Sequence, residues 1–218
     1  ANEIFLLGRE MMDTLRGNPA TGPLSLRVGI VPVLPKLIVR KLLEPVFTLP
    51  ERVHLLCHED NEEDLLGELA VHKLDVVLND APLRKGLHVK AYNHLLGECG
   101  ISFLAVKKMA KTLRAGFPQS LDGAPMLVPV ELTVLRQWLE RWFESLNIRP
   151  VIIGEFADSA LLKAFGQHGD GVFASPSVVE EDIQHQYGVQ VVGRTKIIRE
   201  RYYAISCERI IKHPAVTA

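Results

Sequence analysis

The residues with the clearest chemical meaning lie at the turns of one stretch, Val151 to Pro176, in which strand and helix patterns alternate. Asp158 and Ser175 stand where helices are expected to begin, and both residue types are favoured helix N-caps. Pro176 suits the first position of a helix. Turns of this kind point free backbone N–H groups into a crevice at the carboxyl ends of parallel strands. The stretch therefore predicts a place that holds a small molecule or an ion and does not break a bond.

The sequence lacks the common motifs of catalysis and metal binding. It has no Gly-x-Ser-x-Gly elbow, and Ser159 follows a capping aspartate without an evident base. The glycine-rich run over residues 166–171 follows a helix and precedes a strand, whereas a phosphate loop needs the reverse order, so a helix stop and turn is expected. His54 and His58 lie on a predicted strand about 13 Å apart, too far to share one ion. We therefore expect no enzyme activity, no cofactor and no metal centre.

Composition limits the location and the partners of the chain. With 25 basic and 26 acidic residues the net charge is −1, which gives no electrostatic reason for strong DNA binding by this part alone. The three cysteines are widely separated, which fits a reducing cytoplasm better than a disulfide scaffold. No apolar run reaches the ~18 residues of a membrane span, and no signal peptide opens the chain. A cytoplasmic protein without a membrane partner is expected.

Two series of alternating strands and helices follow from the hydrophobic pattern. The first series has strands over residues 26–31, 52–58 and 75–78, and helices opened by Pro35 and by Asn61, the second running through Leu74. The second series has a strand over residues 125–130, a helix over 131–147, and the strands and helices of the opening stretch, of which the last helix stops at Gly188.

Two further segments, residues 94–106 and 190–207, stand where the chain must pass between the two series. The predicted fold class is α/β, with two βα lobes joined by two crossing strands and a cleft between the lobes. Before the first series, residues 2–16 carry a narrow apolar stripe, which predicts a helix that needs a partner surface.

This order of helix, linker and two βα lobes resembles the effector-binding half of the LysR-type transcriptional regulators, and the lobes resemble those of type 2 periplasmic binding proteins. Within that family, four segments are similar to the activators of sodium/proton antiporter genes. They cover residues 97–103 (GECGISF), 154–158 (GEFAD), 160–166 (ALLKAFG) and 208–216 (ERIIKHPAV). The chain departs from the family pattern at the loops over residues 81–87 and 107–120.

The resemblance implies a transcriptional activator that senses sodium and acts as a homodimer or tetramer. Residues 1–22 would be the end of a linker helix and a linker, residues 23–98 with 207–218 the first effector lobe, and residues 99–206 the second. DNA would be contacted only by a winged helix-turn-helix that precedes this sequence.

The resemblance also places the effector between the lobes, against strand ends and helix starts. Pro32 and Val33 stand where many family members offer a hydroxyl, which argues against a carboxylate effector. Acidic side chains near the cleft would instead suit a hard cation, which prefers oxygen ligands. The expected effector-binding residues are Pro32, Val33, Leu34, Asp80, Glu98, Ser102, Pro129, Glu131, Phe156, Asp158 and Ser175.

Several of these residues have a purely structural alternative. Asp158 is expected to serve as an N-cap more readily than as a ligand, whereas for Glu131 a ligand role and a role that only complements a helix N-terminus stay equally open. Asp80 and Glu98 have no such role, so they rank highest as ligands. A solute-binding protein of a transport system is the alternative function on the same scaffold. A cleft enzyme such as a dehydratase is a third, for which the sequence offers no acid–base pair.

Overall fold

The computed structural model describes residues 24–83, 90–131 and 133–207 of the chain. These residues include both predicted series of strands and helices and the two segments between them. The helix predicted over residues 2–16 and the roles assigned to residues 1–22 and 208–218 lie outside the described residues.

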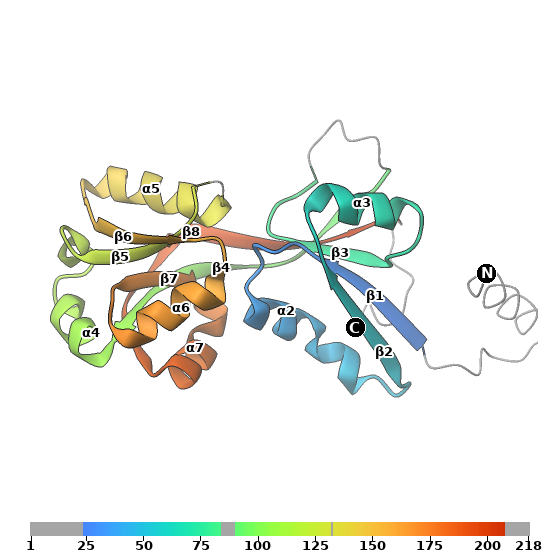
Figure 1. Cartoon of the computed structure of the whole chain (residues 1–218), viewed down its shortest axis with the longest axis horizontal. Helices are drawn as coiled ribbons and strands as arrows, with labels where there is room; N and C mark the ends of the chain where they lie inside the picture. Colours follow the sequence, from blue (N-terminus) through green and yellow to red (C-terminus); the bar gives the residue numbers. More distant parts are fainter. Residues whose placement is uncertain (1–23, 84–89, 132, 208–218) are drawn as a thin grey trace, which may run out of the picture.

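The described chain forms one eight-stranded sheet whose two ends carry separate sets of helices (Figure 1). The strand order is β2-β1-β3-β8-β4-β7-β5-β6. The first half consists of β1 (Leu24–Ile30), α2 (Lys36–Leu43), the 3-10 helix η1 (Glu44–Thr48), β2 (Val53–Glu59), α3 (Glu62–Ala70) and β3 (Val76–Asn79). The second half consists of α4 (Lys107–Arg114), η2 (Gln119–Leu121), β5 (Pro125–Pro129), α5 (Val134–Leu146), β6 (Val151–Phe156), α6 (Ser159–His168), β7 (Val172–Pro176), η3 (Ser177–Val179) and α7 (Glu180–Tyr187).

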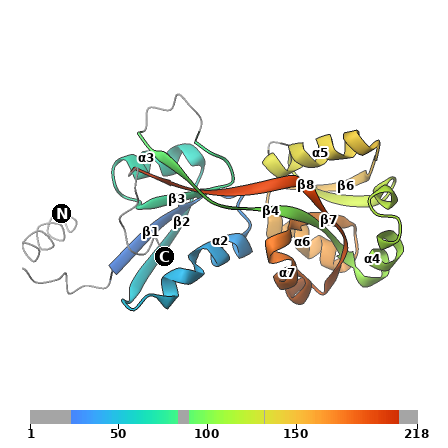
Figure 2. The same ribbon diagram turned by 180° about the vertical axis from the view of Figure 1, so that it is seen from behind.

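Two long strands, β4 (Tyr92–Val106) and β8 (Val189–Ser206), run side by side between the halves (Figure 2). They pair antiparallel along almost their whole length, with irregularities near the middle at Leu95/Gly97 and Cys99/Ile101. The predicted crossing strands are therefore confirmed. Residues 203–205 of β8 pair with β3 of the first half, although the predicted division placed them in the second lobe. The exact lobe boundaries stay a prediction.

Local capping explains several of the helix ends. The Asn61 side chain accepts a hydrogen bond from the Asp64 amide at 3.0 Å, as expected for an N-cap. Asp158 accepts from the amides of Ala160 and Leu161 at the start of α6, so its predicted N-cap role is confirmed. Gly169 and Gly188 end α6 and α7 in the left-handed conformation, with φ of 88° and 64°.

Other boundaries differ from the prediction. Ser175 and Pro176 do not open a helix; they are the last residues of β7, because the pairing of Ser175 with Ser102 of β4 keeps the chain in the sheet. The helix expected from Glu131 begins at Val134, where the side chain of Thr133 is the N-cap.

Two helices also differ in extent. α3 ends at Ala70, before the predicted Leu74, because the chain turns through a left-handed His72 with φ of 57°. α4 was missed, since residues 107–120 appeared only as a divergent loop. Its buried residue is Ala110, and with Met109 and Leu113 it forms an apolar stripe of only three residues, which is short enough to be overlooked among the basic residues of this segment.

The halves are held together by a shared core as well as by the crossing strands. One cluster of buried apolar side chains includes Leu34 and Ile38 of the first half and Phe173 and Val179 of the second. A further cluster lies within the second half around Phe103 and the other aromatic side chains packed on it.

Gly166 in α6 provides a test of this packing. A Cβ atom at Gly166 would lie 2.4 Å from the buried ring of Phe173, so we expect Gly166→Ala to lower the free energy of unfolding by about 1–3 kcal/mol. Gly67 in α3 is the matched control, because a Cβ there meets nothing within 4 Å. Gly67→Ala should raise stability by roughly 0.5–1 kcal/mol. Urea denaturation measures both, and an equal gain in the two variants would contradict the packing.

Candidate functional site

A small pocket lies between the two halves, beside the crossing strand β8. The first half contributes Val33, Pro35 and Asp80, and β8 contributes Glu200 and Tyr202. The second half contributes strand ends and helix starts, among them Pro129, Phe156, Lys163 and Ser175. A ligand in this pocket would therefore touch both halves at once.

The volume of the pocket is about 60 Å³. Pockets for drug-sized molecules usually measure ~300–1,000 Å³, whereas a single water needs about 10–15 Å³. In this arrangement of the halves, the pocket has room for an ion with a few waters.

Charged and polar groups are concentrated in this small space. The Tyr202 hydroxyl donates a hydrogen bond to Glu200 Oε2 at 2.8 Å, and Cys99 Sγ lies 3.8 Å from the same hydroxyl. Lys163 comes from α6, where its Nζ donates to the carbonyl oxygen of Ser159 at 3.1 Å. Lys163 is only 6% exposed, which is rare for a lysine.

Burial shifts the protonation of these groups. It raises the pKa of Glu200 to about 7, an effect that the Tyr202 hydrogen bond opposes and the charge of Asp80 reinforces. Burial also raises the pKa of Asp80. It lowers the pKa of Lys163 to about 8, against the attraction of Asp158 and Glu200. The pocket therefore holds three ionisable groups whose charges are costly to maintain without a compensating ligand or neighbour.

Ser175 adds an unpaired group to the pocket wall. Its side chain is 1% exposed, and within the described residues Oγ has no hydrogen-bond partner. A buried hydroxyl without a partner costs free energy, so Ser175 is a polar group of the pocket wall whose hydrogen-bonding capacity is still unused.

The structure brings five of the predicted effector residues together in this pocket. They are Val33, Asp80, Pro129, Phe156 and Ser175. Whether they bind an effector stays a prediction. The other six do not line the pocket.

Glu98 lies outside the pocket, on the exposed side of the crossing strands. Its carboxylate pairs with Arg199 at 2.9 Å and Arg201 at 3.2 Å. These two arginines give Glu98 the structural role that the sequence did not reveal.

Ser102 belongs to a separate hydrogen-bond network, in which Ser102 and Glu180 are buried and Arg194 is exposed. Its hydroxyl donates to Glu180 at the start of α7, and Arg194 of β8 binds both oxygens of the same carboxylate at 2.7 Å. Arg194 lowers the pKa of Glu180 through these hydrogen bonds. The network ties β4, β8 and α7 together.

The remaining predicted residues have structural positions. Leu34 is part of the shared core, and Pro32 and Glu131 are exposed at turns. The Asp158 carboxylate is used by two backbone amides, which lower its pKa.

Sequence reasoning missed the most polar wall of the pocket, namely Lys163, Glu200 and Tyr202. A usable signal was present for Lys163, which interrupts the apolar run of residues 160–166 on a helix. Glu200 stands between Arg199 and Arg201, and three consecutive charged residues usually indicate a segment exposed to solvent.

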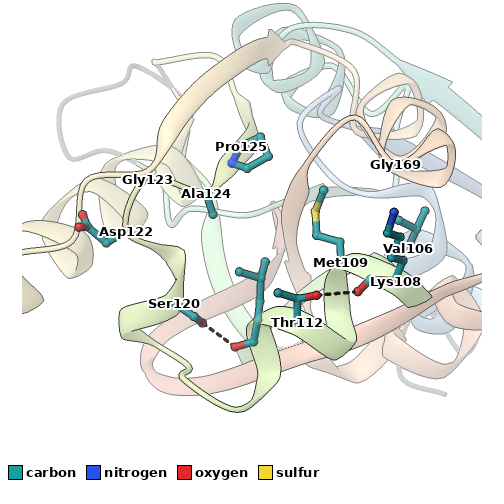
Figure 3. Close-up of a pocket in the computed structure, with 11 residues that line it drawn as sticks. Val106, Lys108, Met109, Thr112, Ser120, Asp122, Gly123, Ala124, Pro125 and Gly169 are labelled. Atoms are coloured by element: carbon teal, nitrogen blue, oxygen red, sulfur yellow. Dashed lines mark hydrogen bonds between the residues drawn. The ribbon is translucent and has the colours of Figure 1, made fainter.

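A larger hollow of about 520 Å³ opens at the far end of the second half, beside α4 (Figure 3). Its hydroxyls are already satisfied, since Thr112 donates to the carbonyl of Lys108 and Ser120 to that of Leu113. The Asp122 carboxylate accepts from the Arg149 amide. The hollow therefore offers few free polar groups, and it lies apart from the predicted effector residues.

Within residues 24–83, 90–131 and 133–207, no group of three or more His, Cys, Asp or Glu side chains is arranged to hold a metal ion. None of the described helices is long and apolar enough to cross a membrane.

Comparison with known families identifies the scaffold. The family model described as the LysR substrate binding domain matches residues 24–218. The chain belongs to the LysR substrate-binding domain family. This LysR-type chain is also 33% identical over 216 residues to the transcriptional activator protein NhaR of Escherichia coli (strain K12), covering 99% of this chain and 70% of NhaR.

Solved structures share the fold of this LysR-type domain. The reduced form of the regulatory domain of OxyR2 from Vibrio vulnificus matches with a TM-score of 0.66 at 13% identity, covering 88% of this chain and 90% of that domain. DarR of Vibrio fischeri, solved in complex with DNA, matches with a TM-score of 0.67 at 16% identity, covering 99% of this chain and 71% of DarR.

These findings confirm the predicted LysR-type effector-binding domain of a transcriptional activator and its two-lobed α/β fold. The family consists of transcription regulators and is not an enzyme family.

Glu200 makes the stability of the LysR-type domain depend on pH. A carboxyl with a higher pKa in the folded chain loses folding free energy as the pH rises from about 4.5 to about 7. Glu200→Gln keeps an acceptor for Tyr202 and removes this loss. We therefore expect the free energy of unfolding of the variant, relative to that of the wild type, to be about 2 kcal/mol higher at pH 8 than at pH 5. Denaturation at the two pH values measures this gain, and a difference independent of pH would contradict the burial of Glu200.

Two substitutions at Asp158 can distinguish a role in helix capping from a role in ligand binding. Asp158→Ala should lower the free energy of unfolding by about 1 kcal/mol, because two amides of α6 lose their acceptor, whereas Asp158→Asn should change it by only a few tenths. Thermal denaturation compares the two variants. An Asp158→Asn protein that folds normally but loses its effector response would show that the carboxylate binds the effector.

Proposed function

We propose that this chain is the sodium-sensing part of a LysR-type activator of a sodium/proton antiporter gene, and that the pocket between the halves is the sensing site. The main support is the pocket itself, which is lined by the acids Asp80 and Glu200 and by Ser175, whose hydroxyl has no hydrogen-bond partner among the described residues. These are oxygen donors, which hard cations prefer. The identity of 33% to NhaR and the segments similar to antiporter-gene activators support the regulated gene.

The volume of the pocket favours an ion over a larger organic effector. About 60 Å³ accommodates a sodium ion that keeps part of its water shell. A structural metal such as zinc does not suit these residues, because within the described chain no cluster of nitrogen or sulfur ligands reaches the pocket.

Binding can act on the shape of the molecule because the pocket walls belong to different parts. Asp80 follows β3 of the first half, Ser175 lies near the end of β7 of the second, and Glu200 lies on the crossing strand β8. An ion held by all three would favour one spacing of the halves. It shifts the equilibrium only to the extent that it binds this arrangement better than the other.

The transmission of the change requires parts beyond this chain. In the proposal, effector domains pair within a homodimer or tetramer in the cytoplasm, and the winged helix-turn-helix domains that precede them contact DNA. DarR, which has the same fold in its matching part, was solved in complex with DNA.

A solute-binding protein of a transport system is the second candidate, because it would use the same two-lobed scaffold. The identity to a transcriptional activator over 99% of the chain favours the regulator. A DNA-binding domain encoded upstream of Ala1 would exclude the transport role, and a secretion signal there would support it.

The test is a titration of the full-length protein with sodium chloride against potassium chloride at constant ionic strength, following promoter binding and transcription in vitro. Sodium should change both readouts and potassium should not. Asp80→Asn should raise the sodium concentration for half response about tenfold or more, because one of two pocket carboxylates loses its charge.

Glu98→Gln is the matched control, since Glu98 is an acid of the crossing strands that pairs with Arg199 and Arg201 outside the pocket. It should leave the half-response concentration within about twofold of the wild type, as is usual for an exposed pair. Equal responses to sodium and potassium would rule out sodium specificity. Loss of response in Glu98→Gln but not in Asp80→Asn would place the sensing site elsewhere.

A further inference from the structure

Lys163 is a positive charge within a pocket proposed to receive a cation. Its side chain is almost fully buried, and it lines the pocket together with Asp80 and Glu200. The proposed function accounts for the two acids but not for the lysine.

The ammonium group of Lys163 is poorly paired. Its hydrogen bond goes to the neutral carbonyl oxygen of Ser159, at 3.1 Å. Within residues 24–83, 90–131 and 133–207, no carboxylate lies within 4.0 Å of Nζ to form an ion pair. Lys163 is attracted by Asp158 and Glu200 from beyond that distance. The lysine therefore offsets part of the negative charge of the pocket without forming an ion pair with either of its carboxylates.

We propose that Lys163 is a tethered counter-ion that sets the concentration at which the pocket accepts a free cation. This inference rests on the proposed function and concerns the affinity of the same site. With Asp80 and Glu200 ionised, the pocket carries a charge of −1 when Lys163 is counted and −2 when it is not. An entering sodium ion is attracted by the acids and repelled by the ammonium group.

The lysine also explains how the empty pocket tolerates two neighbouring acids. Glu200 and Asp80 repel each other, and Lys163 offsets part of this repulsion. Without Lys163, one of these two acids would remain protonated, or the pair would bind a cation tightly at all times. A sensor that must respond to changing concentration needs weak binding, and the like charge of Lys163 in the same pocket weakens the binding of a cation.

The experiment is a sodium chloride titration of this 218-residue chain at constant ionic strength, with choline chloride as the replacement salt, followed by sodium NMR line broadening and calorimetry. Lys163→Met keeps the length of the side chain and removes its charge. We expect sodium to bind about ten- to a hundredfold more tightly to the variant, as expected from the loss of one like charge at a partly buried site. Potassium, titrated in parallel, shows whether the gain is specific.

Lys108→Met is the matched control, because Lys108 is exposed on α4 beside the hollow at the far end of the second half. It removes the same formal charge and should change sodium affinity by less than about twofold, since exposed charges at that separation are screened. Lys163→Gln serves as a second variant if Lys163→Met fails to fold, and it should also tighten sodium binding.

The outcomes distinguish this inference from the proposed function. If the wild type binds sodium and both Lys163 variants bind it with the same affinity as the wild type, the proposal that Lys163 is a tethered counter-ion is wrong, and the proposed sodium site is retained. Weaker binding in both Lys163 variants would show that the lysine holds the ligand in place, which also overturns the inference. If neither the wild type nor the Lys163 variants bind sodium, the proposed function fails and the inference falls with it.

Discussion

The antiparallel pairing of β4 with β8 is the constraint on which the rest of the structure depends. These two strands continue the sheet from β3 in the first half to β7 in the second, so the two halves share one set of backbone hydrogen bonds. The Glu180 carboxylate, bound by Ser102 of β4 and Arg194 of β8, secures the second half to this pair. Gly100 permits the close approach, because a Cβ there would lie 2.6 Å from the carbonyl oxygen of Thr195.

The same pairing creates the pocket and its electrostatics. Because β8 passes between the halves, Glu200 faces a space that the two halves enclose, although its neighbours Arg199 and Arg201 bind Glu98 in solvent. The enclosure raises the pKa of Glu200 to about 7. In water an ionised carboxylate such as that of Glu200 would be well solvated. Between the halves it has lost much of this solvation, so its free energy depends strongly on any charged or polar group that enters the pocket.

Features that depend on neighbouring residues were predicted from the sequence, whereas features that depend on remote segments were not. N-caps such as Asn61 and Asp158 were predicted correctly, because a cap acts on amides two or three residues away. Ser175 has the same residue type as many caps but lies in β7, because a strand far away in the sequence pairs with it. The strands of both halves and the crossing segments were predicted from apolar runs in the sequence, including the largely exposed strands β2 and β6. Helix α4 was missed because its apolar stripe is short and lies among basic residues.

The sequence by itself determined the order of strands and helices, the fold class and the resemblance to LysR-type regulators, because these follow from local periodicity, capping and similar segments. Only the tertiary structure decided which polar residues meet. It placed Asp80 and Ser175 in one small pocket and Glu98 outside it, and it added Lys163 and Glu200, which the sequence had not singled out. Burial is the physical reason, since a charged residue becomes an electrostatic element of a site only where the packing of distant segments removes its water.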